Sequence, residues 1–225
     1  MIQILPVVGI PEIAKGDDLA LLIFEAWGQD FVPNDVVVVA QKAVSKAEDR
    51  LVPASDRRAA ALAESARVLR RSGEMLISET VHGFVCANAG VDSSNVPDGT
   101  VALLPLDPDL SARRIRERLR QLTGQEIAVI VADTFGRAWR IGQTNVAIGL
   151  AGIDPFIDYR GTFDSYGREL HATRIAIADE IAGAAEMVMG KSDRVCAAIV
   201  RGAPIVAGRG AAVDIARPPR EDLFR

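Results

Sequence analysis

Short apolar runs recur along the chain, and each run is bounded by charged residues, glycine or proline. Runs rich in β-branched and small residues predict strands over residues 2–8, 36–40, 75–78, 101–104, 127–131, 145–149 and 195–200. Apolar residues at helical spacing predict helices over residues 17–26, 55–71, 107–122 and 174–189. Strands that alternate with helices predict a protein of the α/β class.

The runs Val36–Ala40 and Ile127–Val131 are apolar at every position. A strand with one solvated face would alternate apolar and polar residues, so these two runs predict strands that are buried on both faces. Pro6 interrupts the first predicted strand, and proline cannot donate to a neighbouring strand. We therefore expect the N-terminal strand at an edge of its sheet.

The residues that follow the strand Ile127–Val131 are mostly polar, and their apolar members show neither the period of a helix nor that of a strand. Asp133 and Thr134 come first, and a carboxylate beside a hydroxyl suits a hard cation. Arg137 and Arg140 follow, and guanidinium groups suit the phosphate or carboxylate of a substrate. Because ligands of α/β proteins bind beyond the carboxyl ends of strands, we interpret this stretch as an active-site loop. The alternative is an Asp-Thr cap that opens a helix, with the arginines on its solvated face.

Polar residues also follow the strand Val36–Ala40, namely Gln41, Lys42, Ser45 and Lys46. Two lysines and a serine at a strand end suit the phosphates of a nucleotide, although the spacing is not the glycine-rich P-loop pattern. A solvated turn is an equally good interpretation of this segment.

Two further turns carry candidate ligand groups. The turn Gly9–Ile13 has open backbone amides that could contact a base or ribose, or it is an ordinary turn. Asp92 and Asn95 place a carboxylate and an amide in one turn, an arrangement that suits metal and nucleotide but also occurs in simple turns. His82 precedes a glycine and is interpreted as a structural residue.

Composition excludes several classes of protein. The 225 residues are 49% hydrophobic and 25% charged, as in ordinary globular proteins, and they suffice for one large domain or two small intertwined ones. The net charge of −4 and the dispersed basic residues argue against a nucleic-acid partner. Apolar runs are shorter than the roughly 20 residues of a membrane helix, and no signal peptide is evident, so we expect no membrane partner and a cytoplasmic location.

The two cysteines, Cys86 and Cys196, both lie in apolar runs. Cysteines in such surroundings are typical of reduced buried thiols rather than of a disulfide or a zinc site. We therefore expect two free thiols that take no part in catalysis.

Four segments together resemble the coenzyme F420-0:L-glutamate ligase family: HGFVCANAGVDSSNV, ADTFGRAWRIGQTNVAIG, DYRG and ADEIAGAAEMVMGK. They are long, they occur in the family's order, and the resemblance extends over essentially the whole chain. It implies a mixed α/β protomer intertwined with a second copy in a homodimer. It also implies one unit over residues 1–225, without the nitroreductase-like domain that some members carry.

The resemblance implies a GTP-dependent enzyme that joins L-glutamate to coenzyme F420-0, with release of GDP and phosphate. Divalent Mg²⁺ or Mn²⁺ is expected, with K⁺ as a further cofactor. By position, the metal would be held by Asp92, Asp133 and Thr134. Nucleotide contacts would come from Ile10, Pro11, Glu12, Ile13, Gln41, Lys46, Asn95, Gly190, Lys191, Ser192 and Asp193. Asp92 and Asp133 are 41 residues apart, so they can share a cation only if their two strand ends are neighbours.

The chain departs from the family's pattern at four positions. Ala132 replaces a threonine, Asn145 replaces an aspartate, and Gln41 replaces a serine of the first phosphate loop. Lys191 stands where archaeal members have a metal-binding glutamine, so an ammonium group would replace that ligand and alter the second metal site. We therefore assign Lys191 to the nucleotide alone.

The implied reaction activates a carboxylate as an acyl phosphate, which the amine of glutamate then attacks. Arg137 and Arg140 would hold the substrate's phosphate or the carboxylate of glutamate through paired hydrogen bonds. Two other functions fit the same residues: a metal-dependent nucleotidyltransferase and a non-catalytic GTP-binding protein. The released products distinguish the three.

Overall fold

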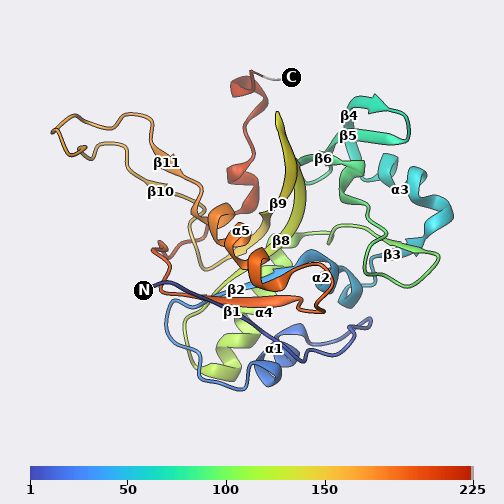
Figure 1. Ribbon diagram of the computed structural model, residues 1–225, viewed down its shortest axis with the longest axis horizontal. Coiled ribbons are helices and arrows are strands. Elements are labelled where there is room, and N and C mark those ends of the chain that lie inside the picture. Colours follow the sequence, from blue (N-terminus) through green and yellow to red (C-terminus); the bar gives the residue numbers. More distant parts are fainter. Residues whose placement is uncertain (224–225) are drawn as a thin grey trace.

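A five-stranded sheet lies at the centre of the computed structural model, which describes residues 1–223 (Figure 1). Its order is β1-β12-β2-β8-β9, with the bounds Gln3–Pro6, Ala197–Arg201, Val36–Ala40, Ala128–Arg137 and Arg140–Ala151. Strands β2 and β8 run parallel, whereas the other neighbouring pairs are antiparallel. This sheet and its flanking helices confirm the mixed α/β class, and β1 is an edge strand as predicted. Residues 224 and 225 of the expected unit 1–225 lie outside the described residues.

Helices cover both faces of this sheet (Figure 1). On one side α4, Pro108–Thr123, packs against β8 and β9, and α1, Leu19–Trp27, packs against α4. On the other side α5, Ile177–Met189, packs against β1, β9 and β12. Residues 36–39 of β2 have no accessible surface, which confirms the strand that was predicted to be buried on both faces.

The ends of two helices follow directly from the sequence. The carboxylates of Asp18 and Asp107 accept hydrogen bonds from backbone amides in the first turns of α1 and α4, at 3.0 and 2.8 Å. Gly28 and Gly124 adopt left-handed conformations at the opposite ends, where a side chain would be strained. The helices predicted over residues 17–26 and 107–122 are therefore confirmed.

A smaller region with its own apolar core packs beside the main sheet. It contains β3, α3, β4, β5, β6 and β7, with the bounds Leu51–Pro53, Arg57–Ala63, Ser65–Ser72, Met75–Thr80, Val85–Ala87 and Thr100–Ala102. Helix α2, Gln41–Ala47, precedes this region and packs Ala43 and Val44 into the main core. The strands of the smaller region form the sheets β4-β5-β6 and β3-β7, and its core is built by Ala61, Leu76, Val91, Val101 and Leu103. Short 3₁₀ turns at Ala54–Asp56 and Asn88–Gly90 complete this region.

The helix predicted over residues 55–71 is wrong beyond Ala63. Residues 65–72 form β4 instead, which pairs antiparallel with β5. Gly73, which would have ended the helix, lies at φ +57° between the two paired strands. The apolar residues at helical spacing favoured a helix only locally. The backbone N–H and C=O groups of β4 form hydrogen bonds with β5 instead, and this pairing outweighs the local preference for a helix.

The loop predicted after Asp133 is a β-hairpin. Strand β8 continues to Arg137, β9 begins at Arg140, and the two strands project beyond the rest of the sheet (Figure 1). Ile141 near the tip is fully exposed. Hydrogen bonds between β8 and β9 account for the extended conformation of this segment, although its sequence lacks the alternating apolar pattern.

A second projection carries residues 159–173 between β10, Ile157–Asp158, and β11, Arg174–Ile175 (Figure 1). The chain then ends with 3₁₀ turns at Ala212–Ile215 and Pro219–Glu221. Cys86 is buried and Cys196 is half-buried, and both are free thiols as expected. Among residues 1–223, no helix combines the length and apolarity that crossing a bilayer requires.

We predict that Arg201→Ala destabilises the fold by about 3 kcal/mol, because it leaves a buried carboxylate without its ion pair. Asp35 has no accessible surface, and the Nε and Nη2 atoms of Arg201 donate to its two oxygens at 2.8 Å each. Urea unfolding at neutral pH measures the change. The control Lys15→Ala breaks the exposed pair with Asp49 and should cost less than about 1 kcal/mol. Equal effects of the two substitutions would contradict the prediction.

Candidate active site

The carboxyl ends of β2 and β8 lie side by side. Ala40, the last residue of β2, is in register with Ala132 of β8, so the next residues of the two segments leave the sheet at one edge. Asp133 follows on β8, and α2 begins directly after β2 with Gln41 and Lys42. The two groups of polar residues that the sequence placed after separate strands are therefore neighbours.

Asp92 reaches the same edge from the smaller region. Its backbone forms an isolated bridge with Ala102, and its carboxylate lies 2.6 Å from the Nζ atom of Lys42. The amide and hydroxyl of Ser94 also donate to this carboxylate, each at 2.9 Å. Burial acts to raise the pKa of Asp92, but the hydrogen bonds from Lys42 and Ser94 outweigh burial and leave that pKa below its ordinary value.

The pKa of the Asp133 carboxyl group is shifted in the opposite direction. Burial raises the pKa of Asp133 to about 6, while the charges of Lys42 and Lys191 lower it and the charge of Asp92 adds to the rise. Asp92 and Asp133 thus interact with each other and with one shared lysine. Asp92 and Asp133 are therefore neighbours, as they must be if they are to share a cation.

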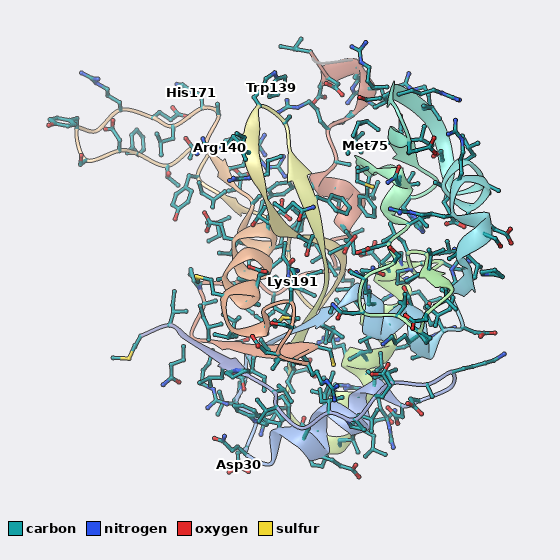
Figure 2. The ribbon with its side chains drawn as sticks, turned by 45° about the vertical axis from the view of Figure 1, so that its right-hand side comes forward. Asp30, Met75, Trp139, Arg140, His171 and Lys191 are labelled. Carbon is teal, nitrogen blue, oxygen red and sulfur yellow. The ribbon has the colours of Figure 1, made fainter. Side chains whose placement is uncertain are left out.

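Lys191 lies where α5 ends, next to the hairpin of β8 and β9 (Figure 2). Thr134 and Asn145 face each other across that hairpin, and the Thr134 hydroxyl donates to the Asn145 Oδ1 atom at 2.6 Å. The Nζ atom of Lys191 donates to the Thr134 hydroxyl and lies 3.4 Å from Asn145 Oδ1. An ammonium group is therefore in contact with the hydroxyl that the family resemblance assigns to a metal.

Two further contacts join the candidate nucleotide residues to this edge. Asn95 donates to the backbone oxygen of Lys191 at 3.1 Å, which ties the turn after Asp92 to the loop of residues 190–193. Lys46 lies 2.5 Å from a carboxylate oxygen of Glu12, which ties α2 to the turn of residues 10–13.

Helix α2 links these two groups of residues. Lys42 and Lys46 are one helical turn apart, so their ammonium groups lie on one face of α2. Both lysine side chains are largely covered by the surrounding protein. This row of positive charge, running from the turn of residues 10–13 to the carboxylates, suits a polyphosphate.

Three predicted site residues lie apart from this arrangement. Gln41 is buried, with its Oε1 atom accepting from the Ser45 hydroxyl at 2.9 Å and its Nε2 atom without a hydrogen-bond partner among residues 1–223. Arg137 and Arg140 are exposed at the far end of the hairpin, where Figure 2 shows Arg140 beside Trp139 and well away from Lys191. At a rise of about 3.4 Å per residue, Arg137 is roughly 14 Å along β8 from Asp133. Within one protomer, these arginines do not meet the carboxylates.

The sequence interpretation missed the part played by Lys42. It grouped this lysine with candidate phosphate-binding residues, but it gave no reason to place the ammonium between Asp92 and Asp133. The position of Lys42 directly after a buried strand was the available signal, because residues at such positions on neighbouring parallel strands converge.

The chemistry of the donor set fits Mg²⁺ or Mn²⁺. Carboxylate oxygens of Asp92 and Asp133 are hard donors, and Mg²⁺ usually takes one or two carboxylates and completes its shell with water and phosphate oxygens. Within residues 1–223, no three His, Cys, Asp or Glu side chains gather in a way that could hold a metal by themselves. Two carboxylates would leave the rest of such an ion's coordination shell to water or to ligand oxygens.

The sequence profile described as F420-0:Gamma-glutamyl ligase matches residues 8–67 and 56–202 of this chain. The chain belongs to this family. Proteins named coenzyme F420:L-glutamate ligase are similar over most or all of their length. That of Methanothermobacter thermautotrophicus is 41% identical over 249 aligned positions, covering 100% of this chain and 99% of the relative. Those of Archaeoglobus fulgidus and Methanocaldococcus jannaschii are 41% and 39% identical, covering 100% and 85% of this chain and 96% and 85% of the relatives.

Members of the F420-0:gamma-glutamyl ligase family are enzymes that form amide bonds, so this chain is a ligase. The profile match includes Asp92, Asp133 and Lys191, together with both strands whose ends meet.

We predict that Asp92→Asn and Asp133→Asn each weaken Mn²⁺ binding at least about 10-fold, because each removes a charged oxygen from the shared centre. Electron paramagnetic resonance of free Mn²⁺ measures the affinity in the presence of GDP. Asp30→Asn is the matched control, since Asp30 lies at the base of the molecule, far from Lys191 (Figure 2). Unchanged affinity in both variants, with the fold intact, would remove the two carboxylates from the metal site.

Proposed function

We propose that this protein uses GTP to form a γ-glutamyl amide bond between L-glutamate and coenzyme F420-0, a step in F420 biosynthesis. Full-length relatives named coenzyme F420:L-glutamate ligase support the substrates. The observation that carries the proposal is the meeting of Asp92, Asp133 and Lys42 at one sheet edge. Two carboxylates and a lysine are the groups that phosphoryl transfer from a nucleoside triphosphate requires.

A carboxylate does not react with an amine at a useful rate until one of its oxygens becomes a good leaving group. In the proposed reaction, a carboxylate oxygen of F420-0 attacks the γ-phosphorus of GTP, and the bond from that phosphorus to the GDP oxygen breaks. The amine of glutamate then attacks the acyl carbon, loses a proton, and displaces phosphate. The products are the amide, GDP and phosphate.

The residues of the chain contribute position and charge to both steps. A divalent ion, Mg²⁺ or Mn²⁺, would be held by Asp92 and Asp133 near Thr134, where it would neutralise charge on the phosphates. Lys42 and Lys46 would hold phosphate oxygens along α2. The backbone of residues 10–13, Asn95 and the loop 190–193 would surround the nucleotide. K⁺ is proposed as a further cofactor on the family resemblance alone.

The proposed reaction needs no covalent enzyme intermediate, and the Cys86 thiol near Asp133 is poorly suited to act as a nucleophile. Burial, together with the nearby charge of Asp133, raises the pKa of the Cys86 thiol to about 12. The thiol therefore stays protonated and unreactive at neutral pH. We therefore assign Cys86 a packing role beneath the site.

The hairpin supports a homodimer as the functional unit. Ile141 is fully exposed near the tip, and a projecting two-stranded ribbon is marginally stable by itself in water. We propose that the hairpin of one protomer packs on a second copy, which would intertwine the two chains. Arg137 and Arg140 would then reach substrate at the interface and not within their own protomer.

The reaction products test the proposed function. Incubation with F420-0, glutamate and GTP should yield the amide by mass spectrometry, with GDP and phosphate released only when both acyl substrate and amine are present. Asp133→Asn should lower turnover at least about 1,000-fold with an unchanged circular dichroism spectrum, since it removes charge that acts on the transition state. Release of pyrophosphate would instead indicate a nucleotidyltransferase, and GTP binding without any product would indicate a non-catalytic GTP-binding protein.

We predict that Ile141→Glu shifts the protein from dimer to monomer, because a charge would be buried at the proposed interface. Sedimentation velocity at micromolar concentration measures the species present. Ile2→Glu adds the same charge to another exposed isoleucine, outside the hairpin, and should leave the dimer intact. A monomeric parent protein, or an Ile141→Glu dimer as stable as the parent, would contradict the proposed interface.

A further inference from the structure

Lys191 occupies a small cradle of oxygen atoms beside Asp133. Its Nζ atom donates to the Thr134 hydroxyl, lies 3.4 Å from Asn145 Oδ1 and lies 3.6 Å from a carboxylate oxygen of Glu186. The charge of Lys191 also acts on Asp133. These oxygens come from β8, β9 and α5, so the fold assembles the cradle from three separate elements.

The backbone around Lys191 is held in place from both sides. Gly190 ends α5 at φ +59°, and its amide donates to the backbone oxygen of Glu186 at 2.9 Å. With ψ at −163°, residue 190 has a backbone conformation that is strained for any residue with a side chain, so the reversal of the chain favours glycine. Asn95 then holds the backbone oxygen of Lys191. The lysine is therefore directed back toward β8 by its anchored loop.

The donors in the cradle suit a single positive charge. The Thr134 hydroxyl gives its proton to Asn145 Oδ1, which leaves the lone pairs of Thr134 facing the ammonium. Asn145 is buried and uncharged, so the hydroxyl and amide supply no negative charge, and the negative charge in the cradle is that of the Glu186 carboxylate named above. A divalent ion prefers carboxylate oxygens and would be repelled by an ammonium at contact distance.

We propose that Lys191 is a tethered cation that takes the place of a divalent ion at Thr134 and Asn145. The centre formed by Asp92 and Asp133 would then be the metal-binding part of the site, and the ammonium of Lys191 would meet the phosphates from the opposite side. This inference rests on the proposed function for the identity of the ligand. The occupancy of the cradle by lysine instead of metal is independent of turnover.

Substitutions that change the charge of the cradle test this inference. Lys191→Gln removes the ammonium and supplies a neutral oxygen, and Asn145→Asp supplies a carboxylate in the same place. The double variant Lys191→Gln/Asn145→Asp should bind one more Mn²⁺ per protomer than the parent, both with Mn²⁺ alone and with Mn²⁺ and GDP. Equilibrium dialysis with metal analysis counts the bound ions, and Mn²⁺ resonance spectra report each site. No catalytic activity is needed for either readout.

Two variants complete the design. Lys15→Gln removes an exposed lysine on a different surface and should bind the same number of ions as the parent. Lys191→Gln alone should gain the same additional ion with weaker affinity, and it decides the question if the double variant fails to give the parent's circular dichroism spectrum. Equal Mn²⁺ counts in the parent and in the folded Lys191→Gln variants would overturn the inference. That result would leave the proposed ligase intact, whereas loss of the ligase reaction would leave the ion count unaffected.

Discussion

The parallel pairing of β2 with β8 decides where the chemistry of this protein lies. Parallel strands end at the same edge, so the register of Ala40 with Ala132 brings Lys42 and Asp133 together although they are far apart in the chain. Helices on both faces of the sheet bury residues 36–39 of β2 and residues 128–132 of β8. A rigid, dry sheet edge is the kind of support on which charged groups can be held in a fixed arrangement.

Charge balance is the second constraint on the site. Asp92 and Asp133 repel each other, and Lys42 offsets this repulsion from a largely covered position on α2. On the other side of Asp133, Lys191 lies among the oxygens of the hairpin. Each carboxylate therefore has a lysine within reach. In the proposed reaction, a phosphate with its ion would enter by exchanging partners with these groups.

The hairpin connects this site to the assembly of the protein. The segment that begins with Asp133 and Thr134 at the sheet edge continues, on the same strands, to Arg137 and Arg140 at an exposed tip. One pair of strands therefore carries both the candidate metal ligands and the surface proposed to meet a second copy. The hydrogen bonds between β8 and β9 account for the extended conformation of these polar strands, which have no apolar period.

The sequence by itself determined the elements whose own residues carry the signal. Completely apolar runs identified the buried strands β2 and β8, aspartate caps and terminal glycines located α1 and α4, and polar residues after strands pointed to Asp92 and Asp133. Only the tertiary structure decided the rest. Strand β4 and strand β8 of the hairpin are extended because each pairs with the strand that directly follows it, and Lys42 and Lys191 acquire their roles from oxygens 50 and 57 residues away. Such pairings depend on distances in space, which a local pattern does not contain.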